Sequence, residues 1–321
     1  MIRVAAVDLG TNSTRLLIAD VADNSIREVE RRLTITRLGE GVDARRRLLP
    51  VPIARVRNCL TEFRRAIEAS GAERTLAVAT SAVRDAENGE ALLGEIEWSY
   101  GFATRLLSGE EEALLTLGGV TADRSLEPGT LIVDVGGGST ELIAGGPGGV
   151  DFRTSLDVGC VRLTERFLSA DPPSASALAE CSGAVRALLA ERIPDDVRRG
   201  IRAGIGVAGT VTTLAALDLD LLVYDRERVH GYRLSAASVA QQLRRLAALP
   251  LSARRRVPGL QPERAPVIVA GIVIVQEVLS HFGLDVLEVS EHDLLHGTAL
   301  AAAELPAAVE GDAPPGAYTC C

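Results

Sequence analysis

The sequence contains no lysine, so its 34 permanently cationic side chains are all arginines. Arginine suits bidentate contact with phosphate, although codon bias across a genome is the simpler explanation for the missing lysine. Aromatic residues make up only 3% of the chain, which disfavours the stacking platforms of single-strand nucleic-acid binders. A net charge of −9 also argues against a general nucleic-acid binder, but not against a small or linear polyanion held at one local cationic site.

Long apolar runs are missing too. The longest, Val267–Val275, is much shorter than the roughly 18 residues of a membrane span and predicts a buried helix or strand, so we expect no membrane partner. The first residues, MIRVAAVDLG, have a strand pattern without the features of a secretory leader. Together with an odd number of cysteines in no metal-binding spacing, this favours a cytoplasmic protein with free thiols. The cysteines are Cys59, Cys160, Cys181, Cys320 and Cys321.

The apolar content that is present is sufficient for large cores. Of 321 residues, 47% are hydrophobic and 24% are charged, which excludes a largely disordered chain. A chain of this length exceeds one ordinary core, and two domains are the natural expectation.

An internal repeat supports two domains. The segments VDLGTNSTRLL (7–17) and VDVGGGSTELI (133–143) align without gaps, with identical residues at six positions. Each has an apolar strand, an aspartate, a tight glycine-containing turn and a second apolar strand, which is the pattern of a β-hairpin. The repeat predicts a duplicated domain. The matching pairs are Val7 and Val133, Asp8 and Asp134, Gly10 and Gly136, Ser13 and Ser139, Thr14 and Thr140, and Leu16 and Leu142.

Periodicity assigns the remaining elements. After the first hairpin, a strand at 26–38, a helix from Ile53, a strand at 74–80 and further helix and strand patterns give the order βββαβαβα, a mixed sheet with helical crossovers. Residues 121–129 are polar with Pro and Gly and are the expected link. The second half is helix-rich. We expect domains at 1–122 and 123–304 and a flexible tail at 305–321, with the option that the last helix packs back on the first domain.

Three glycine-containing segments are candidate anion sites: the turn at Gly10, the run Gly136–Gly138 and the segment Gly204–Thr210. Gly136–Gly138 can point successive backbone N–H groups into one concavity, which suits phosphate oxygens. Asp134 and Glu141 flank this cluster and make sense there if a hard cation such as Mg²⁺ is bound. The third cluster, at Gly209 and Thr210, opens a helix whose N-terminus could hold an anion, but a plain strand–turn–helix junction explains it equally well.

The candidate general base lies in the segment SGEEEA (108–113). Ser108 and Glu111 have the spacing of a capping box, and successive helical residues point about 100° apart. Glu112 is therefore the glutamate that can face a ligand, while Glu110 stays in solvent; the alternative is three surface glutamates at a helix start. Arg84 follows a strand and could clamp a phosphate, or pair with Asp85 or Glu87.

His292 and His296 have a spacing that could bind a metal ion on one helix. No third ligand is evident in the sequence. Helix capping by Ser290 or Asp293 is the favoured interpretation of this segment.

Taken together, these motifs resemble the Ppx/GppA phosphatase family of exopolyphosphatases and guanosine pentaphosphate phosphohydrolases. The resemblance covers roughly residues 2–303, through VDLGTNSTRLLIAD, ATSAVRDAEN, SGEEEA, VDVGGGSTE, DVGCVRLTE, GVAGTVTTLAAL and VSEHDLLHG. It implies an α/β fold of duplicated actin-like ATPase (ribonuclease H-like) domains with a cleft between them. A departure is the third glutamate in SGEEEA, which precedes the usual pair.

The resemblance also implies roles for individual residues. Glu112 activates the attacking water and Arg84 binds phosphate. Asp134 and Glu141, with Asp8, are linked to Mg²⁺, with Mn²⁺ as a second option. The expected phosphate-binding residues are Gly10, Thr11, Asn12, Ser13, Gly136, Gly137, Gly138, Ser139, Gly209 and Thr210.

The predicted function is an exopolyphosphatase that removes the terminal phosphate of polyphosphate. The alternative is a guanosine pentaphosphate 5′-phosphohydrolase, which would link the chain to the stringent response. An ATP-dependent kinase of the same superfold and a non-catalytic polyphosphate sensor are the further alternatives. The expected partner is one of these polyphosphorylated substrates, and a homodimer is one option for assembly.

Overall fold

The computed structural model describes residues 1–23 and 25–306 and divides into two compact units. The first unit consists of Met1–Arg124 and the chain from His292 onward, and the second is Ser125–Glu291. The sequence-based boundary at 122/123 differs from this division by two residues, and α14 (Leu294–Glu304) is grouped with the first unit. The tail expected at 305–321 lies outside the described residues from position 307.

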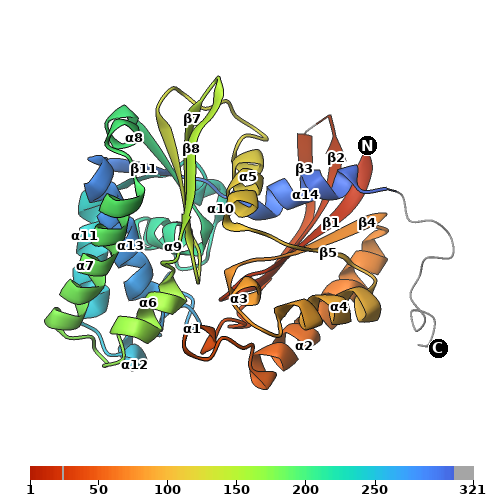
Figure 1. The fold of residues 1–321 in the computed structure, drawn as a ribbon, viewed down its shortest axis with the longest axis horizontal. Coiled ribbons are helices and arrows are strands. Elements are labelled where there is room, and N and C mark those ends of the chain that lie inside the picture. Colours follow the sequence, from red (N-terminus) through yellow and green to blue (C-terminus); the bar gives the residue numbers. More distant parts are fainter. Residues whose placement is uncertain (24, 307–321) are drawn as a thin grey trace. The chain divides into compact units, whose positions relative to one another are not determined.

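The first unit contains a five-stranded mixed sheet (Figure 1). Its order is β3-β2-β1-β4-β5, in which β1, β2 and β3 are antiparallel while β4 and β5 continue parallel to β1. The crossovers between β1, β4 and β5 are helical, as the predicted order requires. The strands are β1 (Ile2–Leu9), β2 (Thr14–Ala22), β3 (Ser25–Thr34), β4 (Arg74–Ala79) and β5 (Ala103–Leu106).

Helices cover both faces of this sheet because the side chains of a strand alternate between its faces. Along β1, Ala5, Val7 and Leu9 pack with α2 (Pro50–Ser70) and α4 (Gly89–Tyr100). Val4 and Ala6 pack on the other side in a core that includes buried residues of α14. The short helices α1 (Val42–Arg45) and α3 (Ser81–Arg84) connect the strands.

Two glycines let α14 approach α5 (Gly109–Val120) closely. A Cβ atom on Gly119 would lie 1.9 Å from the carbonyl oxygen of Asp293, and one on Gly297 would lie 1.9 Å from that of Leu115. Only hydrogen fits at either position. This crossing holds the C-terminal helix against the first sheet, although the second unit intervenes in sequence.

The second sheet repeats the order of the first. Read from β8, it runs β8-β7-β6-β9-β11-β10, so that its first five strands correspond one by one to β3-β2-β1-β4-β5. Strands β6, β9 and β11 are parallel and the β6–β7–β8 meander is antiparallel. The expected duplicated α/β fold of the actin-like type is confirmed. The strands are β6 (Thr130–Val135), β7 (Thr140–Gly146), β8 (Gly149–Leu156), β9 (Ala203–Val207), β10 (Arg233–Ser235) and β11 (Val286–Val289).

The second unit is rich in helices, as expected, and its single core surrounds α13 (Ile268–Phe282). The apolar run at 267–275 forms a buried helix rather than a strand: Ile268–Val275 are all buried, and α13 packs with α6, α7, α9 and α11. The helices are α6 (Cys160–Phe167), α7 (Ala175–Arg192), α8 (Asp195–Gly200), α9 (Ala208–Asp218), α10 (Arg226–Val229), α11 (Ala236–Ala247) and α12 (Leu251–Arg254).

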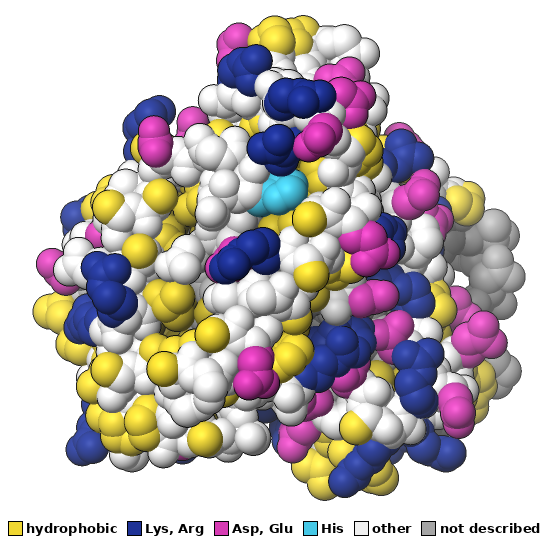
Figure 2. Space-filling model, turned by 60° about the vertical axis from the view of Figure 1, so that its left-hand side comes forward, with side chains coloured by type: hydrophobic (Ala, Val, Ile, Leu, Met, Phe, Trp, Pro, Cys, Tyr) yellow, Lys and Arg dark blue, Asp and Glu magenta, His cyan; other side chains and the backbone are white. Residues whose placement is uncertain are grey.

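The surface shows no segregation by charge on the face drawn in Figure 2, where arginines lie intermixed with acidic side chains. That face, in its described part, does not present the continuous basic surface of a nucleic-acid binder. Among the described residues, no helix combines the length and apolar character needed to cross a membrane.

Candidate active site

The two predicted hairpins close with the same turn. Gly10 N–H donates to the Ser13 carbonyl at 3.0 Å, and Gly136 N–H donates to the Ser139 carbonyl at 3.0 Å. The residues at the mouths of the hairpins differ, because Asp8 faces Arg15 across the first and Asp134 faces Glu141 across the second. The duplicated backbone therefore carries a cationic partner in one copy and an acidic partner in the other.

The first turn is held from outside the hairpin. Gly39 N–H donates to the Thr11 carbonyl at 2.8 Å, and Arg37 N–H donates to the Asn12 carbonyl at 2.9 Å. The N–H of a peptide unit lies opposite its C=O. The N–H groups of Asn12 and Ser13 therefore point away from these donors.

Asn12 is the strongest indication of a ligand in the first unit. Its side chain is buried, and neither Nδ2 nor Oδ1 has a hydrogen-bond partner among the described residues. An unsatisfied buried amide costs about 1–3 kcal/mol, a cost that a bound polar ligand removes. The neighbouring Thr11 hydroxyl shares a 2.8 Å hydrogen bond with Ser81, the first residue of α3.

The glycine loop of the second hairpin is anchored by the start of α6. Cys160 N–H donates to Gly136 O at 3.0 Å and Val161 N–H to Gly137 O at 2.8 Å. The buried Arg162 guanidinium donates to Gly138 O through Nε at 2.7 Å. With all three carbonyls turned toward α6, the N–H groups of residues 137–139 point the opposite way. That these N–H groups bind an anion stays a prediction.

Gly159 and Arg162 are functional candidates that motif reading did not single out. Both lie in DVGCVRLTE, and a Cβ atom on Gly159 would lie 2.4 Å from the carbonyl carbon of Gly137. The sequence pattern that could have pointed to them is a glycine followed three residues later by an arginine at the start of a helix. Only the fold shows that they support the glycine loop.

The carboxylates of the second hairpin suit a hard cation. Asp134 and Glu141 are directly opposite across β6 and β7, and both are buried. Like charges in opposed positions are destabilising by themselves, and carboxylate oxygens are the donors that Mg²⁺ prefers. Ser155 donates to Glu141 Oε1 at 2.7 Å and fixes that side chain. This donor set fits Mg²⁺.

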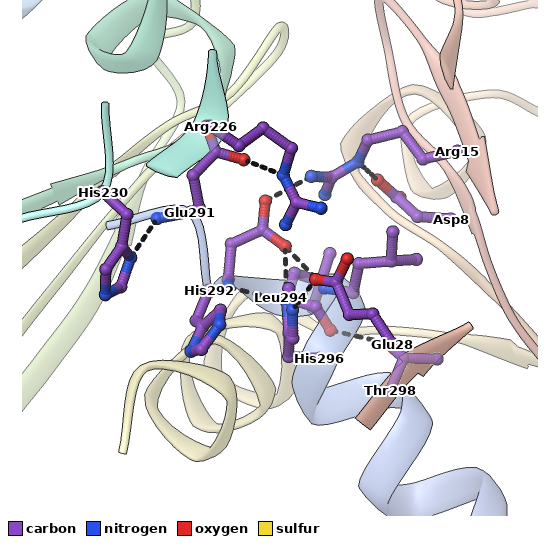
Figure 3. Close-up of polar contacts among 12 residues, drawn as sticks. Asp8, Arg15, Glu28, Arg226, His230, Glu291, His292, Leu294, His296 and Thr298 are labelled. Atoms are coloured by element: carbon purple, nitrogen blue, oxygen red, sulfur yellow. Dashed lines mark hydrogen bonds and ion pairs between the residues drawn. The ribbon is translucent and has the colours of Figure 1, made fainter. Parts of the chain in front are cut away.

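Asp8 fits a metal role only in part, because Arg15 holds one of its oxygens. Arg15 Nε donates to Asp8 Oδ2 at 2.8 Å, while Oδ1 is buried with no hydrogen-bond partner among the described residues. Arg15 also pairs with Asp293 through Nη1 (Figure 3). Burial raises the pKa of Asp8 against the opposing charge of Arg15. One oxygen of Asp8 is thus left to accept a cation or a proton.

The three glutamates of α5 have different surroundings. The predicted capping box between Ser108 and Glu111 is confirmed, and its hydrogen bond to the Ser108 backbone lowers the pKa of Glu111. Glu110 and Glu111 are exposed, whereas Glu112 is 7% exposed. The structure therefore buries only the glutamate predicted to face a ligand.

Arg84 lies beside Glu112. Its Nη1 donates to the Leu107 carbonyl at 2.7 Å and lies 3.5 Å from Glu112 Oε2. Arg84 ends the same short helix, α3, that Ser81 begins, and Ser81 contacts the first hairpin through Thr11. In the first unit, one short helix thus connects the Asn12 turn, Arg84 and Glu112. The Asn12 turn and Arg84 can donate to an anion, and Glu112 supplies a buried carboxylate.

The third glycine cluster also contacts an arginine. Gly209 and Thr210 lie in the first turn of α9, and a Cβ atom on Gly209 would lie 2.0 Å from Nη1 of Arg264. The guanidinium therefore lies over the glycine at a helix N-terminus, where an anion is favoured. Arg264 was not singled out from the sequence, because it lies 55 positions after Gly209.

The three cysteines in the described part of the chain are not activated as nucleophiles. Cys59, Cys160 and Cys181 are buried free thiols, and burial raises the pKa of each, to about 11 for Cys160 and Cys181. A protonated buried thiol is inert. Cys320 and Cys321 lie outside the described residues.

Comparison with known proteins identifies the family of the chain. The model of the Ppx/GppA phosphatase family matches residues 17–304. Exopolyphosphatase 2 of Mycobacterium tuberculosis is 40% identical over 319 residues, covering 94% of this chain and 98% of the relative. The crystal structure of an exopolyphosphatase-like protein is 36% identical with a TM-score of 0.87, covering 93% of this chain and 98% of that one. The Aquifex aeolicus member of the family is 32% identical with a TM-score of 0.79, covering 94% and 97%. The chain belongs to the Ppx/GppA phosphatase family, whose members are hydrolases of phosphoanhydride bonds.

Proposed function

We propose that this chain is an exopolyphosphatase in which Glu112 prepares a water molecule to attack the terminal phosphate. The observation that carries the proposal is the burial of Glu112, alone among three consecutive glutamates, with the Arg84 guanidinium 3.5 Å away. A carboxylate next to a phosphate-binding cation is the pairing that water activation at a phosphoryl group needs.

In this mechanism Glu112 orients the attacking water and accepts its proton at the carboxylate. Its backbone is fixed in the first turns of α5, where the capping box prevents fraying. Arg84 is held by the Leu107 carbonyl, and its other N–H groups bind oxygens of the terminal phosphate. A positioned base of this kind contributes about 10²–10⁴-fold to the rate.

Stabilisation of the charge on the phosphoryl group is the larger contribution. The first unit offers Asn12 and the amides of its turn as donors to an anion. The second unit offers the N–H groups of residues 137–139, whose peptide carbonyls are anchored by α6. Gly209 and Thr210, at the start of α9 beneath Arg264, form a further anion site that suits a polyanion with many phosphates.

Asp134 and Glu141 are the residues of the second unit that would hold Mg²⁺. When bound, the ion neutralises charge on phosphate oxygens. We expect Asp134→Asn to raise the Mg²⁺ concentration for half-maximal phosphate release by at least about tenfold, because the variant keeps the shape of the side chain but loses its charge. Titration of the rate with Mg²⁺ measures the shift.

The exposed Asp151, on β8 of the same sheet, provides the matched control. Asp151→Asn should keep the Mg²⁺ dependence of the unmodified protein. Equal dependence in both variants would mean that Asp134 does not hold the ion.

Polyphosphate is the proposed substrate because of the similarity to exopolyphosphatase 2 over nearly the whole length of both chains. The test is phosphate release from long-chain polyphosphate, guanosine pentaphosphate and ATP, each with and without Mg²⁺. Release mainly from polyphosphate supports the proposal, whereas release mainly from guanosine pentaphosphate overturns the substrate assignment. Consumption of ATP only with a hydroxyl acceptor would indicate a kinase, and binding without turnover would indicate a sensor.

A further inference from the structure

The start of α14 and strand β3 bring together three metal-ligating side chains that the catalytic site does not use. They are Glu28 on β3, His292 just before the helix and His296 in its first turn. One ligand atom from each lies within 4.8 Å of the other two. The sequence offers only the two histidines as a pair, because Glu28 is 268 positions away from His296.

The contacts between these groups are direct. His296 Nε2 lies 2.8 Å from Glu28 Oε1, and the two imidazole rings lie side by side with centroids 4.3 Å apart (Figure 3). Ligands around a tetrahedral ion are about 3.4 Å apart when each bond is about 2.1 Å. Movements on the order of 1 Å therefore bring the three atoms to metal-binding distances.

The other ring nitrogen of each histidine also has a neighbour. His292 Nδ1 lies 3.2 Å from Asp123 Oδ2, the kind of carboxylate that fixes the ring of a metal-binding histidine. His296 Nδ1 accepts a hydrogen bond from Asp293 N–H at 3.3 Å in the capping box of α14. This contact orients the second ring so that its Nε2 faces Glu28.

Burial suits both entry and retention of an ion. The His296 side chain is 1% exposed, whereas those of Glu28 and His292 are 25% and 27% exposed. An ion can therefore reach the three side chains from the partly exposed side, at Glu28 and His292. It then meets His296, whose buried ring is held in place. Asp293, the N-cap of α14, confirms the predicted capping and holds the helix start in place.

We propose that Glu28, His292 and His296 form a binding site for a divalent transition metal ion of the zinc type, separate from the carboxylate site for Mg²⁺. Two imidazoles and one carboxylate favour zinc-like ions over Mg²⁺, which prefers oxygen ligands alone. An ion bound here joins β3 to α14, two parts of the first unit from opposite ends of the sequence.

The test uses the full-length protein stripped with a chelator and titrated calorimetrically with Zn²⁺ in the presence of excess Mg²⁺. We expect one tightly bound Zn²⁺ per chain and a rise in Tm of at least about 3 °C. Co²⁺ in place of Zn²⁺ should give the visible absorption of a four-coordinate site. Absence of a retained Zn²⁺ would overturn the proposal.

Variants then assign the ligands. Glu28→Gln and His292→Ala, at partly exposed positions, should each weaken Zn²⁺ binding at least about 100-fold, and Asp123→Asn about 10–100-fold. Glu30→Gln, on the same strand, is the matched control and should bind Zn²⁺ like the unmodified protein. Unchanged affinity in His292→Ala would show that Glu28 and His296 form only a structural hydrogen bond.

Discussion

Replacing Glu112 by glutamine should lower the rate of phosphate release by about 10²–10⁴-fold while polyphosphate still binds. Glutamine keeps the size of the side chain in its buried position, but its amide cannot accept the proton of the attacking water. Arg84 loses a charged neighbour at 3.5 Å and stays fixed by the Leu107 carbonyl. Steady-state kinetics and polyphosphate binding by the purified variant measure the two effects separately.

The adjacent Glu110 and Glu111 are matched controls, because they are the same residue type on the same helix but are exposed. Glu110→Gln, at an exposed position, should leave rate and stability unchanged. Glu111→Gln keeps a capping-box side chain at N3 but removes its charge near the helix N-terminus, so it should cost about 0.3–1 kcal/mol of stability without a comparable loss of rate. Near-normal turnover in Glu112→Gln, or a larger loss in Glu110→Gln, would assign the base to another carboxylate.

Gly159→Ala, at the start of α6, is expected to displace the glycine loop at residues 136–138. The added methyl group would lie 2.4 Å from the Gly137 carbonyl carbon and 2.5 Å from Gly138 N, both of which are backbone atoms that cannot rotate away. We expect a loss of about 1–3 kcal/mol in the free energy of unfolding. We also expect a higher KM for polyphosphate, because the displaced loop no longer directs its N–H groups at the phosphate.

Gly183→Ala makes the same chemical change on α7 and is the control. A Cβ atom there has no neighbour within 4 Å, so removing a helical glycine should stabilise the protein by roughly 0.5–1 kcal/mol. Urea denaturation and KM measurements compare the two variants. If Gly159→Ala is as stable and active as Gly183→Ala, then α6 does not support the loop.

Local patterns predicted the elements that carry the site. The two hairpins follow from strand periodicity around glycine turns, and the capping box of α5 follows from Ser108 and Glu111. The hairpins and the capping box each form between residues close together in sequence, so they can be recognised without knowledge of the fold. The apolar run Val267–Val275 left helix and strand open, because a short run without polar interruptions fits both, and the structure shows the helix α13 from Ile268. Strands β10 and β11, of 3 and 4 residues, are too short for periodicity to reveal.

The sequence alone was enough to predict the duplicated α/β architecture, the glycine turns and Glu112 as the glutamate that differs from its two neighbours. Each of these predictions depends on the spacing of residues within a short segment. The tertiary structure alone decided which distant groups meet. It placed α14 on the first sheet, Arg162 under the glycine loop, and Glu28 beside His296. Such contacts join segments that are separated in sequence, by 24 residues for Arg162 and Gly138 and by 268 for Glu28 and His296. Close approach at glycines and burial of apolar faces select one arrangement of these segments, which no local pattern encodes.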